Sequence, residues 1–192
     1  VMEKVVIADS WKAVFARNGI KTFSEFYYGI AKKRITRSRD KKRSVSMIEL
    51  QTEKGPQKLF LKRFRHPHFK DILFTFLNTG RFQSQAGFEA DNIDLLEKNG
   101  ISVPKVAAFG EQVKLGLERR SFIILEEAKG QCMTDFIAQN WDEMPLAEKQ
   151  KVISSLAKTI RKIHDANIGL TDLYLWHIFI SENENHDYDF AF

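Results

Sequence analysis

Two neighbouring segments alternate between apolar and polar residues, which predicts a β-hairpin. The first is VSMIEL at residues 45–50, the second is KLFLKRF at residues 58–64, and the EKGPQ between them offers a Gly-Pro turn. Because side chains alternate along a strand, Phe60, Lys62 and Phe64 of the second segment share one face. A strand lysine usually faces solvent, whereas Lys62 has an apolar neighbour on either side. The pattern therefore singles out Lys62 on the second strand.

A second pair of strands is predicted after Pro104, where the chain reads KVAAFGEQV and then RRSFIILEE. The latter segment is a continuous apolar run, which is typical of a central and buried strand. Apolar residues at helical spacing predict helices in residues 8–18, 69–77, 87–98, 133–141 and 146–166. The apolar stripe at 69–77 indicates either packing on the body of the protein or docking to a membrane or partner.

The longest of these helices has one face with the residues Ile153, Leu156, Ala157, Ile160, Ile163 and His164, so we expect His164 among core positions. Strands gathered in the first two-thirds of the chain, with helices after them, indicate a two-lobed α+β architecture. The expected parts are an N-terminal helix and basic segment in residues 1–40, a sheet lobe in residues 41–128 and a partial helical lobe in residues 129–192.

Composition favours a folded protein without a membrane span. The chain has 192 residues, of which 43% are hydrophobic and 12% aromatic, as expected of a packed core. No run of about 18 apolar residues is present, and the charged N-terminus does not resemble a secretion signal. The single cysteine, Cys132, excludes an internal disulfide and, with five scattered histidines, a usual structural zinc site. A reducing cytoplasm is the expected location.

Positive charge is concentrated in one segment of a chain whose net charge is +5. Residues 32–42 read KKRITRSRDKK, with Asp40 as the one acid. The segment is either a solvated basic loop or a surface for phosphates, acidic lipid or nucleic acid. We expect no nucleic-acid partner, because that interpretation rests on charge alone and lacks an aromatic platform motif.

Near its C-terminal end the chain combines an aspartate and a histidine. The stretch IHDANIGLTDLYLWHIFI at residues 163–180 reads as the end of a helix, a turn and an apolar segment, with Asp172 and, five residues later, His177. A carboxylate on a loop after a long helix can accept the proton of an attacking hydroxyl, and a neutral imidazole can bind a divalent cation. The alternative for His177 is a partly buried histidine without a ligand.

The order of these elements resembles the protein-kinase-like fold. Kinases carry a lysine on a strand, where it contacts nucleotide phosphates, and a helix glutamate that holds this lysine. LFLK ends at Lys62, and Glu89 in the next helix is the best match for the glutamate, with Asp91 and Asp94 as rivals.

Two further segments extend this resemblance. FIILEEAKG at residues 122–130 is similar to the last sheet strand and hinge of a kinase, which implies that Leu125 lies at the back of the nucleotide site and that Glu126 and Ala128 contact adenine through their backbone. LTDLYLWH matches the catalytic loop H-R-D-L-x-x-x-N, with Asp172 at the Asp and His177 at the Asn position.

The match implies particular chemistry for the loop. Asp172 would position the acceptor hydroxyl, and His177 would help to hold Mg²⁺ or Mn²⁺ beside ATP. His164, eight residues before Asp172, matches a kinase histidine and is expected to orient the loop rather than to bind a ligand.

The variant D-x-Y-x-x-H, with GI-x-x-P at residues 100–104 and FLKRFR at residues 60–65, resembles the lipopolysaccharide kinase family of bacteria. This resemblance runs from about Trp11 to the last residue. It implies an ATP-dependent phosphotransferase that acts on heptose or Kdo sugars of the lipopolysaccharide inner core. It further implies a cytoplasmic protein with a glycolipid or sugar acceptor and a peripheral contact with the inner membrane, made by the basic segment and residues 69–77.

The chain departs from the kinase pattern at three places. The region ITRSRDKKRSV contains no glycine, so basic side chains such as Arg37 and Arg39 would have to replace the backbone amides that cradle phosphates. Thr171 replaces the arginine that receives an activation-loop phosphate, so we expect no such phosphorylation switch. Asp189 lies 17 residues after Asp172, as the metal aspartate of D-F-G could, but we expect residues 188–192 to form a strand and the domain to be truncated.

Two other functions remain open from the sequence. A kinase-like enzyme acting on protein Ser or Thr would use the same residues. A pseudokinase-like interaction module without catalysis would explain the missing glycine-rich loop.

Overall fold

The computed structural model describes residues 1–30, 33–34, 42–66, 83–115, 117–170 and 173–192. The expected helix at residues 69–77, most of the basic segment and Asp172 lie outside these ranges. The chain forms two compact units. The first comprises Val1–Asn92 and Lys105–Glu127, and the second comprises Ile93–Pro104 and Ala128–Phe192.

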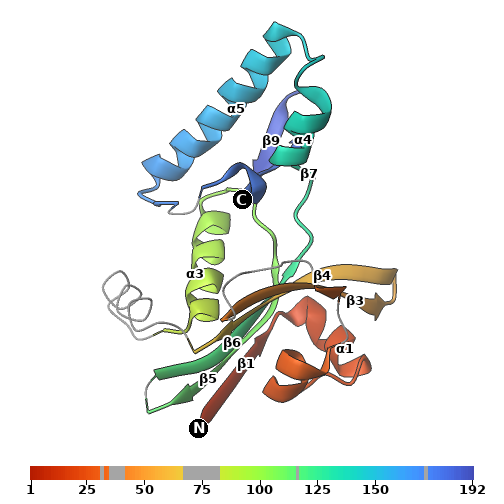
Figure 1. Ribbon diagram of the computed structural model, residues 1–192, viewed down its shortest axis with the longest axis vertical. Helices are drawn as coiled ribbons and strands as arrows, with labels where there is room; N and C mark the ends of the chain where they lie inside the picture. The colour runs from red at the N-terminus through yellow and green to blue at the C-terminus, as the bar shows by residue number, and fades with distance from the viewer. Residues whose placement is uncertain (31–32, 35–41, 67–82, 116, 171–172) are drawn as a thin grey trace. The chain divides into compact units, whose positions relative to one another are not determined.

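The first unit is built on a six-stranded antiparallel sheet with the order β1-β5-β6-β4-β3-β2 (Figure 1). Its strands are β1 (Met2–Ile7), β2 (Lys33–Arg34), β3 (Arg43–Thr52), β4 (Gly55–Arg65), β5 (Val106–Lys114) and β6 (Leu117–Glu126). The predicted hairpin is confirmed as β3 and β4, and Val45 lies opposite Lys62. The continuous apolar run is confirmed as β6, which lies between β4 and β5 and is buried from Ser121 to Leu125.

The N-terminal strand β1 is an element that the sequence pattern did not reveal. It pairs with β5 along its whole length, and Val5 lies opposite Gly110. A Cβ atom at Gly110 would lie 2.5 Å from the ring of Phe122 and 3.0 Å from the carbonyl oxygen of Lys4. Only glycine therefore allows β1 to approach the sheet at this position.

One face of this sheet carries the core of the first unit. Helix α1 (Asp9–Arg17), predicted from its apolar spacing, and the π-helix η1 (Glu25–Gly29) pack here. The rings of Phe26 and Phe122 stack with centroids 5.2 Å apart. Leu59 and Leu61 of β4 are fully buried on this face, so the alternate residues of β4, including Lys62, point to the opposite side.

Helix α3 (Gln85–Lys98) was predicted from residue 87, two residues later than it begins. Figure 1 shows its first turns on the side of the sheet opposite α1. This is the side to which Lys62 of β4 projects.

The second unit combines a small sheet with two helices. Its elements are β7 (Gln131–Cys132), α4 (Met133–Asn140), α5 (Leu146–Asp165), the 3-10 turn η2 (Leu175–His177), β8 (Phe179–Glu182) and β9 (Tyr188–Ala191). The sheet has the order β7-β8-β9, and its core includes Met133, Val152, Ile178 and Phe190. The predicted strand at residues 188–192 is therefore present as β9.

The buried face of α5 differs from the predicted one. Val152, Leu156 and Ile163 face the core, whereas Ile153 is 57% exposed and His164 is exposed. The assignment of His164 to the core face is wrong, because the buried stripe runs through Val152, Leu156 and Ile163, and His164 lies about 100° around the helix from Ile163.

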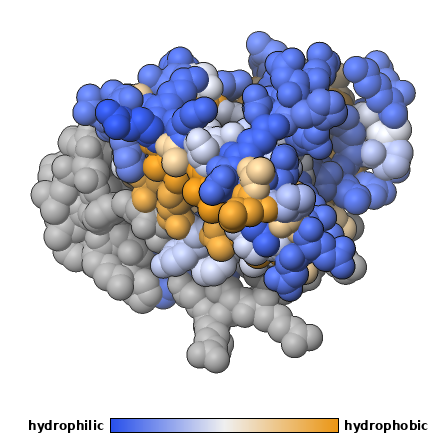
Figure 2. Space-filling view, turned by 90° about the horizontal axis from the view of Figure 1, so that it is seen from above, coloured by the Kyte–Doolittle hydropathy of each residue, from blue (hydrophilic) through white to orange (hydrophobic). Residues whose placement is uncertain are grey.

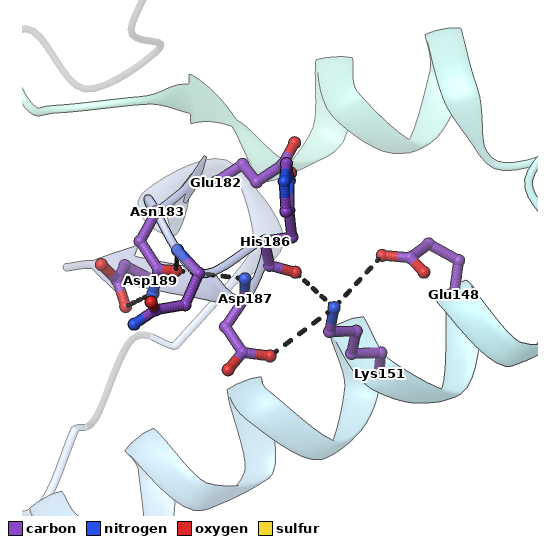
Figure 3. Close-up of polar contacts among 8 residues, drawn as sticks. Glu148, Lys151, Glu182, Asn183, His186, Asp187 and Asp189 are labelled. Carbon is purple, nitrogen blue, oxygen red and sulfur yellow. Dashed lines mark hydrogen bonds and ion pairs between the residues drawn. The ribbon is translucent and has the colours of Figure 1, made fainter.

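The turn between β8 and β9 is fastened to α5 by a lysine (Figure 3). Lys151 donates to the carbonyl oxygen of His186 and lies 3.7 Å from the carboxylate of Asp187 and 4.0 Å from that of Glu148. Within the turn, the side-chain oxygen of Asn183 accepts the backbone N–H of Asp187 at 3.1 Å. These contacts order the hairpin that follows the predicted catalytic loop.

The surface is mainly hydrophilic on the face seen in Figure 2, where apolar residues gather in a limited area. Large apolar side chains exposed among the described residues include Leu146 and Ile153 on α5 and the successive residues Tyr174, Leu175 and Trp176. Among the described residues, no helix is both long and apolar enough to span a membrane.

Candidate active site

An ion pair joins β4 to α3 in the first unit. The ammonium of Lys62 lies 2.5 Å from a carboxylate oxygen of Glu89, and the two side chains are 36% and 27% exposed. The rival acids make other contacts: Asp91 accepts the side-chain amide of Gln83 at 2.8 Å, and Asp94 pairs with Lys98 at 2.5 Å. Of the three candidates, Glu89 is thus the one that contacts the strand lysine.

The first turn of α3 is held against the sheet by two β6 side chains. The backbone N–H of Gln85 donates to the Glu118 carboxylate at 3.0 Å, and that of Ala86 donates to the Ser121 hydroxyl at 3.3 Å. The amides of a helix's first turn lack partners within the helix, and a carboxylate also complements its dipole. These bonds fix the start of α3, and Glu89 follows one turn later.

Glu118 is a buried acid, with only 8% of its surface exposed. Burial raises the pKa of its carboxyl above the ordinary value of 4.5, although hydrogen bonds from Ser121 and Gln85 oppose the shift. The Ser121 hydroxyl donates to the second carboxylate oxygen at 2.5 Å. Both oxygens of the acid therefore have a donor.

The segment that resembles a kinase hinge begins at the end of β6. The backbone N–H of Glu126 donates to the carbonyl oxygen of Lys105 at 2.9 Å, and its side chain accepts the indole N–H of Trp11 at 2.7 Å. Ala128 is half-buried and is the first residue of this segment in the second unit.

The described part of the predicted catalytic loop ends in η2. Asp172 lies outside the described residues, and His177 is the last residue of η2, with an exposed side chain. The imidazole meets the rings of Tyr174 and Trp176 edge-on, at centroid distances of 6.1 and 5.9 Å. Within the described ranges, no group of three or more His, Cys, Asp or Glu residues could hold a metal ion.

Asp189, the sequence-based alternative for a metal ligand, lies in the middle of β9. Its carboxylate is exposed and accepts the side-chain amide of Asn183 at 3.1 Å (Figure 3). The strand setting agrees with the expectation that residues 188–192 form a strand rather than the D-F-G turn.

A family model places the chain among known proteins. The model of the lipopolysaccharide kinase (Kdo/WaaP) family matches residues 21–192. The chain belongs to this family. Family membership supports a kinase, as the resemblance of the motifs implied.

Two curated relatives carry the name lipopolysaccharide core heptose(I) kinase WaaP, one from Escherichia coli strain K12 and one from Escherichia coli. Each is 28% identical to this chain over 133 residues, which are 68% of this chain and 50% of the relative. The chain therefore spans about half the length of the curated relatives it matches.

Two solved structures show the fold. WaaP in complex with acyl carrier protein has a TM-score of 0.69 at 19% identity, over 98% of this chain and 69% of that chain. Rad53 1-466 in complex with AMP-PNP has a TM-score of 0.50 at 12% identity, over 96% of this chain and 44% of that chain. The predicted α+β, protein-kinase-like fold with an antiparallel sheet in its N-terminal lobe is confirmed.

Several residues that position the site could not be identified from the sequence of this chain. Glu118 and Ser121 lie on a strand and support a helix that begins more than 30 positions earlier in the chain. Ser84, whose hydroxyl accepts the backbone N–H of Gly87 at 3.0 Å, offered the one local sign, since serine is a preferred residue at helix starts.

Proposed function

We propose that this chain is the kinase part of an enzyme that transfers the γ-phosphoryl group of ATP to a sugar hydroxyl of the lipopolysaccharide inner core. The observation that carries this proposal is the Lys62–Glu89 ion pair, which joins a sheet strand to a helix in a chain of the lipopolysaccharide kinase family. Such a pair is a recurring part of kinase-type phosphoryl transfer.

Lys62 and Glu89 would act on the phosphates of ATP. A lysine ammonium neutralises phosphate charge, and a carboxylate 2.5 Å away keeps the flexible lysine side chain extended towards its target. The carbonyl of Glu126 and the backbone of Ala128 would contact the adenine. Basic side chains such as Arg37 and Arg39 would take the place of a glycine-rich loop.

Asp172 and His177 would act at the transferred group. Asp172 would accept or orient the proton of the sugar hydroxyl, for which positioning matters more than a shifted pKa. His177 would help to hold a divalent cation, Mg²⁺ or Mn²⁺, which neutralises the charge that develops on the phosphates. An imidazole ligand suits Mn²⁺ better than Mg²⁺, which prefers oxygen.

A cationic cluster of the first unit supports a peripheral contact with the cytoplasmic face of the inner membrane. Burial, followed by the positive charges of Arg119, Arg65, Arg120 and Lys42, lowers the pKa of His66. The four cationic residues around His66, called the cationic cluster, come together because the Arg65 backbone N–H donates to the carbonyl oxygen of Lys42 and that of His66 donates to the carbonyl oxygen of Arg119. Anionic lipid headgroups attract such clusters and would bring the enzyme to a glycolipid acceptor.

The experiment that tests the function is phosphoryl transfer from γ-labelled ATP to separate acceptors. We expect label on a deacylated inner-core oligosaccharide that contains heptose and Kdo, and loss of this label in Asp172→Ala. Label on peptides containing Ser and Thr but not on the oligosaccharide would favour the protein-kinase alternative. Absence of transfer to every acceptor, with unaltered cellular function of Asp172→Ala, would favour the pseudokinase module.

A further inference from the structure

We propose that Tyr174 and Trp176 form an aromatic platform on which a sugar ring of the acceptor stacks. This inference rests on the proposed function and names a binding site for its substrate. The two residues follow the predicted catalytic Asp172 by two and four positions.

The two rings stack face to face, and both are exposed. Their planes are within 10° of parallel, and their centroids lie 4.5 Å apart. Tyr174 is 50% and Trp176 is 56% exposed, although large aromatic rings are usually buried when they serve a core. Since each ring covers one face of the other, the face that each turns away from its partner remains for a ligand.

Backbone hydrogen bonds hold the segment that carries the two rings against the rest of the second unit. The His177 N–H donates to the carbonyl of Tyr174 at 2.9 Å, and the Met133 N–H donates to the carbonyl of Ile178 at 2.8 Å. Ile178 is only 3% exposed and belongs to the core that β8 and α5 share. A platform held in this way loses little conformational freedom when a ligand binds.

The closeness of Tyr174 and Trp176 to Asp172 in the sequence indicates which ligand they would contact. Two residues of polypeptide span at most about 7 Å, so the platform begins within that distance of the residue proposed to hold the acceptor hydroxyl. Adenine is assigned to the hinge segment, which leaves the acceptor as the molecule near Asp172. A pyranose ring has one face of C–H groups, and these carry partial positive charge that matches the negative face of an aromatic ring.

The sugar hydroxyls require polar groups at the platform's edge. The Tyr174 hydroxyl, at the outer end of its ring, can donate and accept hydrogen bonds. A ligand that combines an apolar face with a polar rim matches this arrangement, whereas a lipid tail would leave the polar rim without partners.

The test is a titration of the purified protein with the deacylated inner-core oligosaccharide, in the absence of nucleotide. Trp176→Ala and Tyr174→Ala are expected to weaken binding at least tenfold each, which corresponds to about 1.4 kcal/mol. Trp176→Phe keeps an aromatic face and should remain within about threefold of the wild type. Tyr174→Phe keeps the ring but removes the hydroxyl, so its loss should be smaller than that of Tyr174→Ala. Leu175→Ala, which removes the exposed apolar side chain of the residue between Tyr174 and Trp176 in the sequence, is the matched control and should bind normally.

Steady-state kinetics give a second readout. With the oligosaccharide as acceptor, Trp176→Ala should raise the KM for the acceptor and leave the KM for ATP within about twofold. Equal oligosaccharide affinity in wild type, Trp176→Ala and Tyr174→Ala would overturn the proposal. So would a loss of binding to uncharged phosphatidylcholine vesicles without a loss of oligosaccharide binding, since the rings would then be a membrane anchor.

The experiments distinguish a failure of the proposed kinase function from a failure of the platform. If the protein bound no ATP, the kinase reaction would be excluded, but the oligosaccharide titration needs no nucleotide and still decides the platform. Phosphoryl transfer to the oligosaccharide with the same acceptor KM in wild type, Trp176→Ala and Tyr174→Ala would overturn the platform and leave the proposed function standing.

Discussion

The carboxylate of Glu118 accepts the backbone N–H of Gln85 at 3.0 Å and thereby joins β6 to the first turn of α3. Four residues after Gln85, the same helix carries Glu89, which pairs with Lys62. A buried acid outside the ion pair thus positions the helix that carries Glu89. The stability of this contact should respond to pH.

Glu118 should make the protein more stable at mildly acidic pH than at neutral pH. Its raised pKa means that the folded protein binds this proton more tightly than the unfolded chain does. The stabilisation is complete below the ordinary pKa of 4.5 and is lost as the pH rises through the folded pKa. The slope is at most about 1.4 kcal/mol per pH unit.

The measurement compares the free energy of unfolding of wild type and Glu118→Gln from pH 7 down to pH 4.5 by urea titration. The difference, wild type minus variant, should increase as the pH falls. A difference that stays constant over this range would show that Glu118 has the same pKa in both states.

Glu89→Gln should weaken ATP binding about tenfold. A hydrogen bond to a charged group contributes about 1.5–3 kcal/mol, and the lower end applies because Lys62 is 36% exposed to solvent. Asp91→Asn is the matched control, since this acid lies on the same helix and contacts Gln83 instead of Lys62. Calorimetric titration with ATP checks the prediction, which an equal loss in both variants would contradict.

The cationic cluster should hold the protein at anionic membranes. Arg65→Ser with Arg119→Ser removes two charges that are each worth about 1 kcal/mol near such a surface, so binding to phosphatidylglycerol vesicles should fall roughly thirtyfold. The double change Lys12→Ser and Arg17→Ser removes the same charge from α1 and should have little effect. Raising the salt concentration should reduce the difference between the two double variants. Equal binding by both would assign the attraction to net charge alone.

The sequence was informative where the signal was local. Alternation placed Lys62 on a strand between two phenylalanines, and helical spacing placed Glu89 on the following helix; the two side chains are in contact. It did not separate Glu89 from Asp91 and Asp94, because the direction of a side chain on a helix depends on how the helix is rotated against the sheet. Contacts with Gln83 and Lys98, found in the structure, make this distinction.

Other features depend on contacts between distant parts of the chain. β1 is an edge strand with mainly exposed residues, so its pattern MEKVVI lacks the apolar alternation of a half-buried strand. His164 was assigned to the wrong face of α5 because several apolar residues, including the exposed Ile153, widen the stripe beyond the part that is buried. Ring stacking of Tyr174 on Trp176 follows from the backbone of η2, which sequence spacing alone does not specify.

The most direct test of the central claim is calorimetric titration of the protein with ATP and Mg²⁺ or Mn²⁺. Lys62→Ala is compared with Lys58→Ala, which removes an exposed lysine on the same face of β4 four residues earlier. We predict metal-dependent binding by wild type and Lys58→Ala, and binding at least tenfold weaker by Lys62→Ala, because a lysine–phosphate contact is lost. Equal affinity in all three proteins would contradict the assignment of Lys62 to the nucleotide phosphates.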